Sequence, residues 1–322
     1  MNSDSAIRKK STPATQNPSK HNATSSGSLT REHALLPLLR ALRPLQWTKN
    51  GLVFAALIFD RKFTDAGLIG ISILAAICFC AASSATYLIN DVRDAERDRI
   101  HPKKRFRPIA AGQLSERNAL VAAALLAASA LIGGALIRLE FAAVIAGYLA
   151  LMLAYNAALK QIAIIDVFAI GGGFVLRAVG GAVAIDVPIS PWLYVCTMLL
   201  ALFVGFGKRR QELTSLAEDA TAHRESLHGY TVPLLDQFIN ILAAATVIAY
   251  SVYTFDAAAV PRNHAMMLTI PFVVYAIFRY LLITQRSDLG GAPETLIFAD
   301  RPLLLSLIGW GITSAVIIYV TK

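Results

Sequence analysis

The chain has 322 residues, of which 56% are hydrophobic and only 16% are charged, with a formal net charge of +9. Its mean hydropathy is +0.55, whereas a water-soluble domain of this length carries far more charge. Apolar runs long enough to cross a bilayer core recur along the chain. Because open sheet edges cannot be satisfied in lipid and no barrel-type alternation is present, this composition predicts an all-α, polytopic membrane protein.

Residues 1–33 differ from the remainder of the chain. They are rich in serine, threonine, asparagine and lysine and contain almost no large apolar side chains. Such a segment cannot bury enough surface to fold, so we expect a disordered tail. It also lacks the apolar core and cleavage motif of a secretory signal peptide. Residues 34–322 are expected to form a single helical domain in the membrane.

About nine membrane-spanning helices are predicted. We place them near residues 44–60, 67–89, 118–137, 141–159, 163–185, 190–206, 235–255, 264–283 and 302–320. Basic residues gather at alternate ends of these spans, so the positive-inside rule places the N-terminus and the 90–117 loop in the cytoplasm. The bases suit anionic lipid headgroups. They are spread over membrane loops without interleaved aromatic residues, which argues against a nucleic-acid partner.

Four oxygen-bearing residues follow the second predicted span. Asp91, Asp94 and Asp98 are spaced i, i+3, i+7, which places them on one helix face, and Asn90 lies one turn from Asp94. Carboxylates so close together repel unless a cation lies among them. Mg²⁺ prefers oxygen ligands and keeps positions for substrate phosphate, so these residues are candidate metal ligands. The alternative is a solvated helix end with an asparagine cap.

Two groups of charged residues are candidates for binding a substrate phosphate. Lys103, Lys104, Arg105 and Arg107 directly follow the acidic residues, where they would suit a substrate phosphate. A second group combines Lys160, Asp166 and Arg177 with an apolar run, and charges at membrane depth usually mark a site or an ion pair. Structural pairing with another helix is the alternative for this group.

Two further clusters are ambiguous. Lys208 and Arg209 lie at the cytoplasmic end of the sixth predicted span, just after residue 206, where bases also serve as membrane anchors. Lys49 interrupts the first span, where a lysine that extends its ammonium to the interface is the alternative to a ligand contact.

The Asn-Asp-x-x-Asp-x-x-x-Asp pattern at 90–98 resembles the first aspartate-rich motif of the UbiA superfamily of membrane-embedded transferases. A more specific resemblance is to the decaprenyl-phosphate phosphoribosyltransferase branch. It is carried by RPLQWTKN at 43–50, YLINDVRDAERDRIHPKKRFRPIAAG at 87–112, the Tyr155, Lys160, Asp166 and Arg177 arrangement, and GKRRQEL at 207–213. The resemblance covers about residues 38–320.

This resemblance implies a bundle of membrane helices that transfers a 5-phosphoribosyl group from phosphoribosyl diphosphate to a polyprenyl phosphate. The reaction is Mg²⁺-dependent, releases diphosphate, and is an early step toward cell-wall arabinan. The expected location is the cell inner (plasma) membrane, with a cytoplasmic active site. The expected roles are metal binding by Asn90, Asp91, Asp94 and Asp98; catalysis by Asp94, Asp98 and Asp166; and substrate binding by Lys49, Lys103, Arg105, Arg107, Tyr155, Lys160, Arg177, Lys208 and Arg209.

Two other classes of protein remain open. Many prenyl-transferring members of the superfamily carry a second aspartate-rich motif, but the corresponding region here offers only Asp166 among bases. A prenyltransferase that joins a prenyl diphosphate to an aromatic or haem acceptor is the first alternative. A non-enzymatic transporter or lipid-binding protein is the second, and it is disfavoured because the charges gather at one face rather than at the midplane. Assembly into a homo-oligomer is open.

Overall fold

The computed structural model describes residues 36–60, 62–215, 225–257, 260–286, 296 and 299–320. In these residues every regular element is a helix. Eight of the helices are long and apolar enough to cross a membrane. The predicted all-α membrane bundle is therefore confirmed, whereas the expected tail at 1–33 lies outside the described residues.

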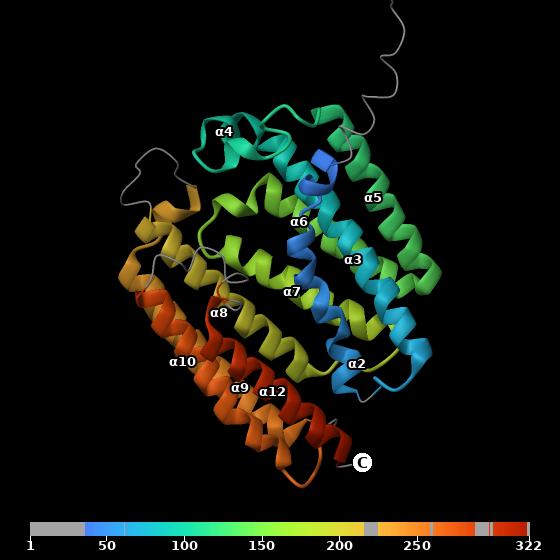
Figure 1. Ribbon diagram of the computed structural model, residues 1–322, viewed down its shortest axis with the longest axis vertical. Coiled ribbons are helices and arrows are strands. Elements are labelled where there is room, and N and C mark those ends of the chain that lie inside the picture. The colour runs from blue at the N-terminus through green and yellow to red at the C-terminus, as the bar shows by residue number, and fades with distance from the viewer. Residues whose placement is uncertain are drawn as a thin grey trace, which may run out of the picture.

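The eight long helices run side by side between two ends of the bundle (Figure 1). They are α3 (Ala66–Arg93), α5 (Glu116–Ile137), α6 (Leu139–Ala157), α7 (Ile165–Ala184), α8 (Pro191–Ser215), α9 (Val232–Asp256), α10 (Ile270–Arg286) and α12 (Arg301–Val320). Shorter elements are η1 (Pro44–Phe54), α2 (Ala55–Phe59), α4 (Ala95–Ile100), η2 (Lys104–Phe106), η3 (Leu159–Gln161), η5 (Glu225–Gly229) and η6 (Ala265–Thr269).

The first predicted span, 44–60, differs from the others. It is a 3-10 helix, η1, followed by the short α-helix α2, rather than one continuous α-helix. A 3-10 helix rises about 2.0 Å per residue, so the two elements together extend about 30 Å, close to the thickness of a bilayer core. Gly181 permits this segment to pack on α7, because a Cβ there would lie 2.0 Å from the Val53 carbonyl oxygen.

Local sequence signals explain where several helices begin. The Asp65 carboxylate accepts the Gly67 and Leu68 N–H groups before α3, and the Thr231 hydroxyl accepts the Leu234 N–H before α9. Ser115 caps α5 in the same way through the Asn118 N–H. These side chains satisfy N–H groups that have no partner within the first turn of a helix.

The two largest of five apolar clusters in the described residues lie in different parts of the bundle. One is centred on Phe79, Phe141 and Tyr148, from α3 and α6. The other includes Phe203 and Tyr280, from α8 and α10. Helices α7 and α8 pack against each other between the two cores. In Figure 1 the short helix α4 lies at one end of the bundle and the C-terminus lies at the opposite end. The end that carries α4 is called the α4 end below.

Candidate functional site

Two of the acidic residues at the α4 end are nearly buried and paired with arginines. Asp91 and Asp98 are only 2% and 3% exposed. Arg107 Nη1 lies 3.2 Å from Asp91 Oδ1 and 2.6 Å from Asp98 Oδ2, so one guanidinium bridges both carboxylates. Arg43, just before η1, adds a 2.6 Å contact from Nη2 to Asp91 Oδ1. This group therefore ties the start of η1 to the end of α3 and to the α4–η2 loop.

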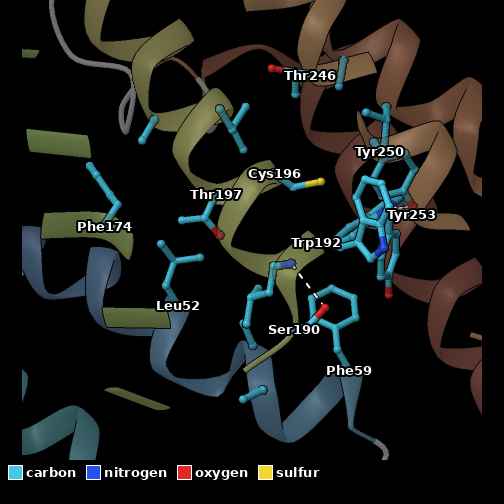
Figure 2. Close-up of a pocket in the computed structure, with 18 of the residues that line it drawn as sticks. Leu52, Phe59, Phe174, Ser190, Trp192, Cys196, Thr197, Thr246, Tyr250 and Tyr253 are labelled. Atoms are coloured by element: carbon cyan, nitrogen blue, oxygen red, sulfur yellow. Dashed lines mark hydrogen bonds between the residues drawn. The ribbon is translucent and has the colours of Figure 1, made fainter. Parts of the chain in front are cut away.

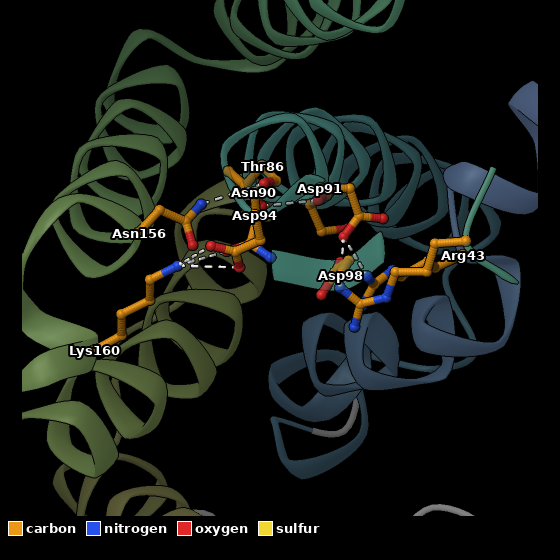
Figure 3. Close-up of polar contacts among 10 residues, drawn as sticks. Arg43, Thr86, Asn90, Asp91, Asp94, Asp98, Asn156 and Lys160 are labelled. Carbon is orange, nitrogen blue, oxygen red and sulfur yellow. Dashed lines mark hydrogen bonds and ion pairs between the residues drawn. The ribbon is translucent and has the colours of Figure 1, made fainter. Parts of the chain in front are cut away.

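The other two candidate metal ligands face a lysine instead. Lys160 Nζ lies 2.9 and 3.1 Å from the two carboxylate oxygens of Asp94 and 3.4 Å from Asn90 Oδ1. Figure 3 shows Asn90, Asp94 and Lys160 on one side of the helix end, and Asp91, Asp98 and Arg43 on the other. Three oxygen atoms thus converge on a single cation, the Lys160 ammonium.

The four candidate metal ligands therefore form two pairs, Asn90 with Asp94 and Asp91 with Asp98, and the three acids do not share one face as expected. Helix α3 ends at Arg93, and Asp94 lies at the junction with α4 with φ −92° and ψ 1°. Bases from opposite sides hold the two pairs apart. Among the described residues, no three histidine, cysteine, aspartate or glutamate side chains gather where they could hold a metal.

The Asn90–Asp94 pair nevertheless fits a divalent cation. Its oxygens already converge on a positive charge, and Mg²⁺ commonly uses one or two protein carboxylates together with phosphate and water. Asp91 and Asp98 would first have to release Arg107. In the structure, Lys160 holds the oxygens of Asn90 and Asp94, and Arg107 holds those of Asp91 and Asp98.

A second charged group lies between α7 and α8. Asp166 is completely buried, and Arg209 Nε lies 2.8 Å from its Oδ2. The Tyr230 hydroxyl donates to the Asp166 carboxylate at 3.1 Å and the Ser226 hydroxyl donates at 3.3 Å. Arg209 also pairs with Glu212. A buried carboxylate paired with a single arginine still has lone pairs without a hydrogen-bond donor. The two hydroxyls supply donors to these lone pairs of Asp166.

Arg177 lies away from the acidic residues. It is about 18 Å along α7 from Ile165, at about 1.5 Å per residue. Its side chain donates to Asn50 Oδ1 at 2.7 Å, to the Gly173 carbonyl at 2.8 Å and to the Tyr148 hydroxyl at 2.9 Å. The structure therefore does not bring Arg177 to Asp94, and it links η1, α6 and α7 deep in the bundle.

The remaining predicted substrate-binding residues are at the surface or partly buried. Lys103 and Arg105 are exposed, whereas Lys49, Tyr155 and Lys208 are half-buried.

Sequence reasoning left Arg43, Ser226, Glu212 and Tyr230 out of the site. Arg43 and Glu212 stand within the motifs that carried the family resemblance, and their charge was the signal that could have identified them. No local pattern around Ser226 and Tyr230 indicated that they meet Asp166.

The loop between α4 and η2 is shaped by a histidine. His101 Nδ1 accepts the backbone N–H groups of Lys103 at 3.1 Å and Lys104 at 3.3 Å. Burial and the nearby Lys104 charge lower the pKa of His101 below its usual value. Burial and the neighbouring Arg107 likewise lower the pKa of Lys104, against the opposing effect of Asp98, Asp94 and Glu212. The negative charges of Asp98, Asp94 and Glu212 therefore all act on Lys104.

An apolar cavity of about 450 Å³ lies among the helices of the bundle. Helices α2, α7, α8, α9, α10 and α12 contribute its lining. Figure 2 shows Leu52 and Phe174 on one side, with Trp192, Tyr250 and Tyr253 on the other. Val204, its lining residue nearest the charged end of α8, is about 7–8 Å along that helix from Arg209. The cavity therefore begins between one and two helical turns from the Asp166–Arg209 pair.

Comparison with known proteins identifies relatives along most of the chain. Residues 52–300 match the UbiA prenyltransferase family. The decaprenyl-phosphate phosphoribosyltransferase of Mycolicibacterium smegmatis is 36% identical over 295 residues, which cover 88% of this chain and 92% of the relative. The protein of the same name from Mycobacterium tuberculosis is 35% identical over 277 residues, covering 85% and 91%.

A solved structure shares the fold. It is a UbiA homolog from Archaeoglobus fulgidus bound to GPP and Mg²⁺, with a TM-score of 0.66 and 21% sequence identity. The match covers 88% of this chain and 97% of that one. At this level of identity the likeness establishes the arrangement of helices.

Proposed function

The chain belongs to the UbiA prenyltransferase family, and we propose that it transfers a 5-phosphoribosyl group from phosphoribosyl diphosphate to a decaprenyl-type polyprenyl phosphate. The similarity to decaprenyl-phosphate phosphoribosyltransferases along nearly their whole length is the observation that carries this proposal. The product would be a polyprenyl-phosphoryl 5-phosphoribose, an early intermediate toward decaprenylphosphoryl-arabinose and cell-wall arabinan.

The donor diphosphate would bind at the α4 end. Asn90 and Asp94 would hold Mg²⁺ through the oxygens that now contact Lys160. Released from them, Lys160 would turn its ammonium to a phosphate oxygen. When bound there, Mg²⁺ would neutralise charge that develops on the departing diphosphate.

The surrounding bases would complete the donor site. Lys103 and Arg105 are exposed after α4, and the negative charges of Asp98, Asp94 and Glu212 act on Lys104. Phosphoribosyl diphosphate carries a diphosphate and a separate 5-phosphate, so a site with more bases than acids suits it. Arg209 would be positioned by Asp166, whereas Arg177 would brace the helices.

The reaction needs little proton transfer. An oxygen of the polyprenyl phosphate attacks C1 of the ribose, the bond between C1 and the diphosphate oxygen breaks, and diphosphate leaves with the bonding electrons. The acceptor is already an anion near neutral pH, so no strong general base is required. Positioned bases stabilise the departing diphosphate electrostatically, and alignment of the two substrates supplies much of the remaining rate.

The acceptor would enter from the membrane. Its phosphate would lie near Arg209, and the isoprene units next to that phosphate would occupy the apolar cavity, which begins close by. We place the α4 end in the cytoplasm, on the basis of the basic residues there, and the protein in the inner (plasma) membrane.

Purified protein tests this function directly. With Mg²⁺ and phosphoribosyl diphosphate, addition of decaprenyl phosphate should release diphosphate and yield a lipid-linked phosphoribosyl product of matching amount. Asp94→Asn provides the inactive control. Product formation from geranylgeranyl diphosphate and an aromatic acceptor, with none from phosphoribosyl diphosphate, would refute the proposal in favour of prenyl transfer.

A further inference from the structure

His101 joins the end of helix α4 to the basic segment that follows it. Its own N–H donates to the Asp98 carbonyl at 3.2 Å, which closes the last turn of α4. Its ring Nδ1 accepts the N–H groups of Lys103 at 3.1 Å and Lys104 at 3.3 Å, and its carbonyl accepts the Arg105 N–H at 3.2 Å. One residue therefore holds the backbone of all three bases.

The arrangement is that of a helix N-cap in which an imidazole replaces the usual side-chain oxygen. His101 has an extended backbone, with φ −82° and ψ 133°, and Pro102 follows it. An N-cap residue has this backbone conformation, its side chain accepts N–H groups two or three residues later, and proline is favoured at the next position. Serine, threonine, aspartate and asparagine are the usual caps, so the histidine departs from the common choice.

The imidazole differs from an aspartate cap in its charge. Nδ1 accepts hydrogen bonds only when it carries no proton, so the ring is the neutral tautomer with its proton on Nε2. It therefore holds the loop without adding a negative charge beside the three bases. A carboxylate in the same place would accept the same N–H groups but would repel an anionic ligand.

The basic segment has a second attachment at its other end, and that attachment is ionic. Arg107 Nη1 lies 3.2 Å from Asp91 Oδ1 and 2.6 Å from Asp98 Oδ2. A metal ion or a phosphate bound beside these groups would compete for their charges. The contacts of His101 are made to backbone N–H groups and involve no ionised side chain, so they would persist when an anion binds.

We propose that His101 is a positioning residue for the donor: its ring nitrogen orders the backbone of residues 103–105 and so holds their three basic side chains beside the donor diphosphate. This inference rests on the proposed function for the identity of the donor. A loop that closes on a phosphate loses backbone and side-chain freedom, so a backbone that is ordered in advance reduces the entropy lost on binding. The bases contact the donor, and His101 acts through them.

Three substitutions of His101 test the inference through initial rates at varied donor concentration. His101→Ala removes the acceptor and should raise the donor KM about fivefold, the shift in population that loss of one cap causes, with little change in kcat or in the acceptor KM. His101→Asn keeps a neutral acceptor for N–H groups two and three residues later, so its donor KM should stay within about twofold of the wild-type value. His101→Asp keeps the acceptor but adds negative charge, and should raise the donor KM above that of His101→Asn.

A second histidine provides the matched control. His264 also directly precedes a 3-10 helix, η6, but its side chain makes no capping hydrogen bond. His264→Ala should therefore leave the donor KM unchanged. If His101→Ala fails to fold, the comparison of His101→Asn with His101→Asp still decides. A wild-type donor KM in folded His101→Ala, a donor KM raised as much by His101→Asn as by His101→Ala, or equal values for His101→Asn and His101→Asp would overturn the inference.

Binding of inorganic diphosphate separates this inference from the proposed function, because diphosphate is the leaving group in both phosphoribosyl and prenyl transfer. With Mg²⁺ present, diphosphate should raise the melting temperature of the purified protein, and His101→Ala should need a higher concentration than the wild type or His101→Asn for the same rise. This pattern without any transfer from phosphoribosyl diphosphate would refute the proposed reaction alone. Normal transfer, with the same diphosphate dependence in all three proteins, would refute the positioning role alone.

Discussion

Replacing Asp166 by asparagine tests whether this carboxylate is a structural partner of Arg209 or a direct substrate contact. The variant keeps the size of the side chain and removes its charge. In the structure Asp166 is fully buried, 2.8 Å from Arg209, with the Ser226 and Tyr230 hydroxyls directed at it. We therefore expect Asp166→Asn to destabilise the folded protein.

The size of the loss can be bounded from these contacts. Breaking a buried ion pair by removing one partner costs about 3–5 kcal/mol, because the other charge is left buried. Here Arg209 keeps its pairing with Glu212, so the lower limit, about 3 kcal/mol, is appropriate. Tyr230→Phe removes one neutral hydrogen bond to the same carboxylate and should cost only about 1 kcal/mol.

Unfolding in mixed detergent micelles measures these losses, and initial rates at varied donor concentration measure function. The double variant Asp166→Asn with Arg209→Met should lose less stability than the two single variants combined, by about 1–3 kcal/mol, as for residues in direct contact. An Asp166→Asn protein as stable as the wild type, but with turnover lowered by orders of magnitude, would refute the structural role and favour direct substrate contact.

Three further outcomes are expected. Asp94→Asn should lower turnover by orders of magnitude with little loss of stability, because Asp94 lies at a helix junction and would bind the metal; near-normal turnover would exclude that role. Arg177→Met should destabilise by about 1–3 kcal/mol, since Asn50 and Tyr148 lose a buried donor, while the apparent donor KM is unchanged; a raised KM in a stable protein would instead indicate ligand contact. The lowered pKa of His101 means that the unfolded chain binds its proton more readily. The stability that neutral His101 contributes should be complete above about pH 6.5 and should be lost as pH falls through the lower pKa of His101 in the folded protein. An NMR titration midpoint for His101 at or above about 6.5 would contradict this.

The division of the acidic motif shows what local spacing can and cannot predict. The apolar run before Asn90 predicted that Asp91, Asp94 and Asp98 follow a membrane helix, because hydrophobic length is a local property. The i, i+3, i+7 spacing predicted one shared helix face, but α3 ends at Arg93 and Asp98 lies in α4. It could not show that Arg43 and Arg107 would hold two of these acids. Arg43 is 48 residues from Asp91 in the chain, and no local pattern specifies which base reaches which carboxylate.

The partners of Arg177 also could not be predicted from local sequence. A charge within an apolar run indicated a ligand contact or a partner on another helix, and the sequence left both open. The neutral groups of Asn50, Tyr148 and Gly173 provide its contacts instead. Two of them come from other helices, so only their packing against α7 assigns Arg177 a bracing position.

The sequence by itself determined that the chain is a helical membrane protein, approximately where its spans lie, and that the aspartate motif and several basic residues lie near helix ends. Those features follow from runs of apolar residues and from short-range spacing, which the chain carries independently of how it packs. The tertiary structure decided the separation of Asn90–Asp94 from Asp91–Asp98, the buried Asp166–Arg209 pair and the residues that line the apolar cavity. Each of these requires side chains from distant helices to meet, and such contacts exist only after the helices have packed together.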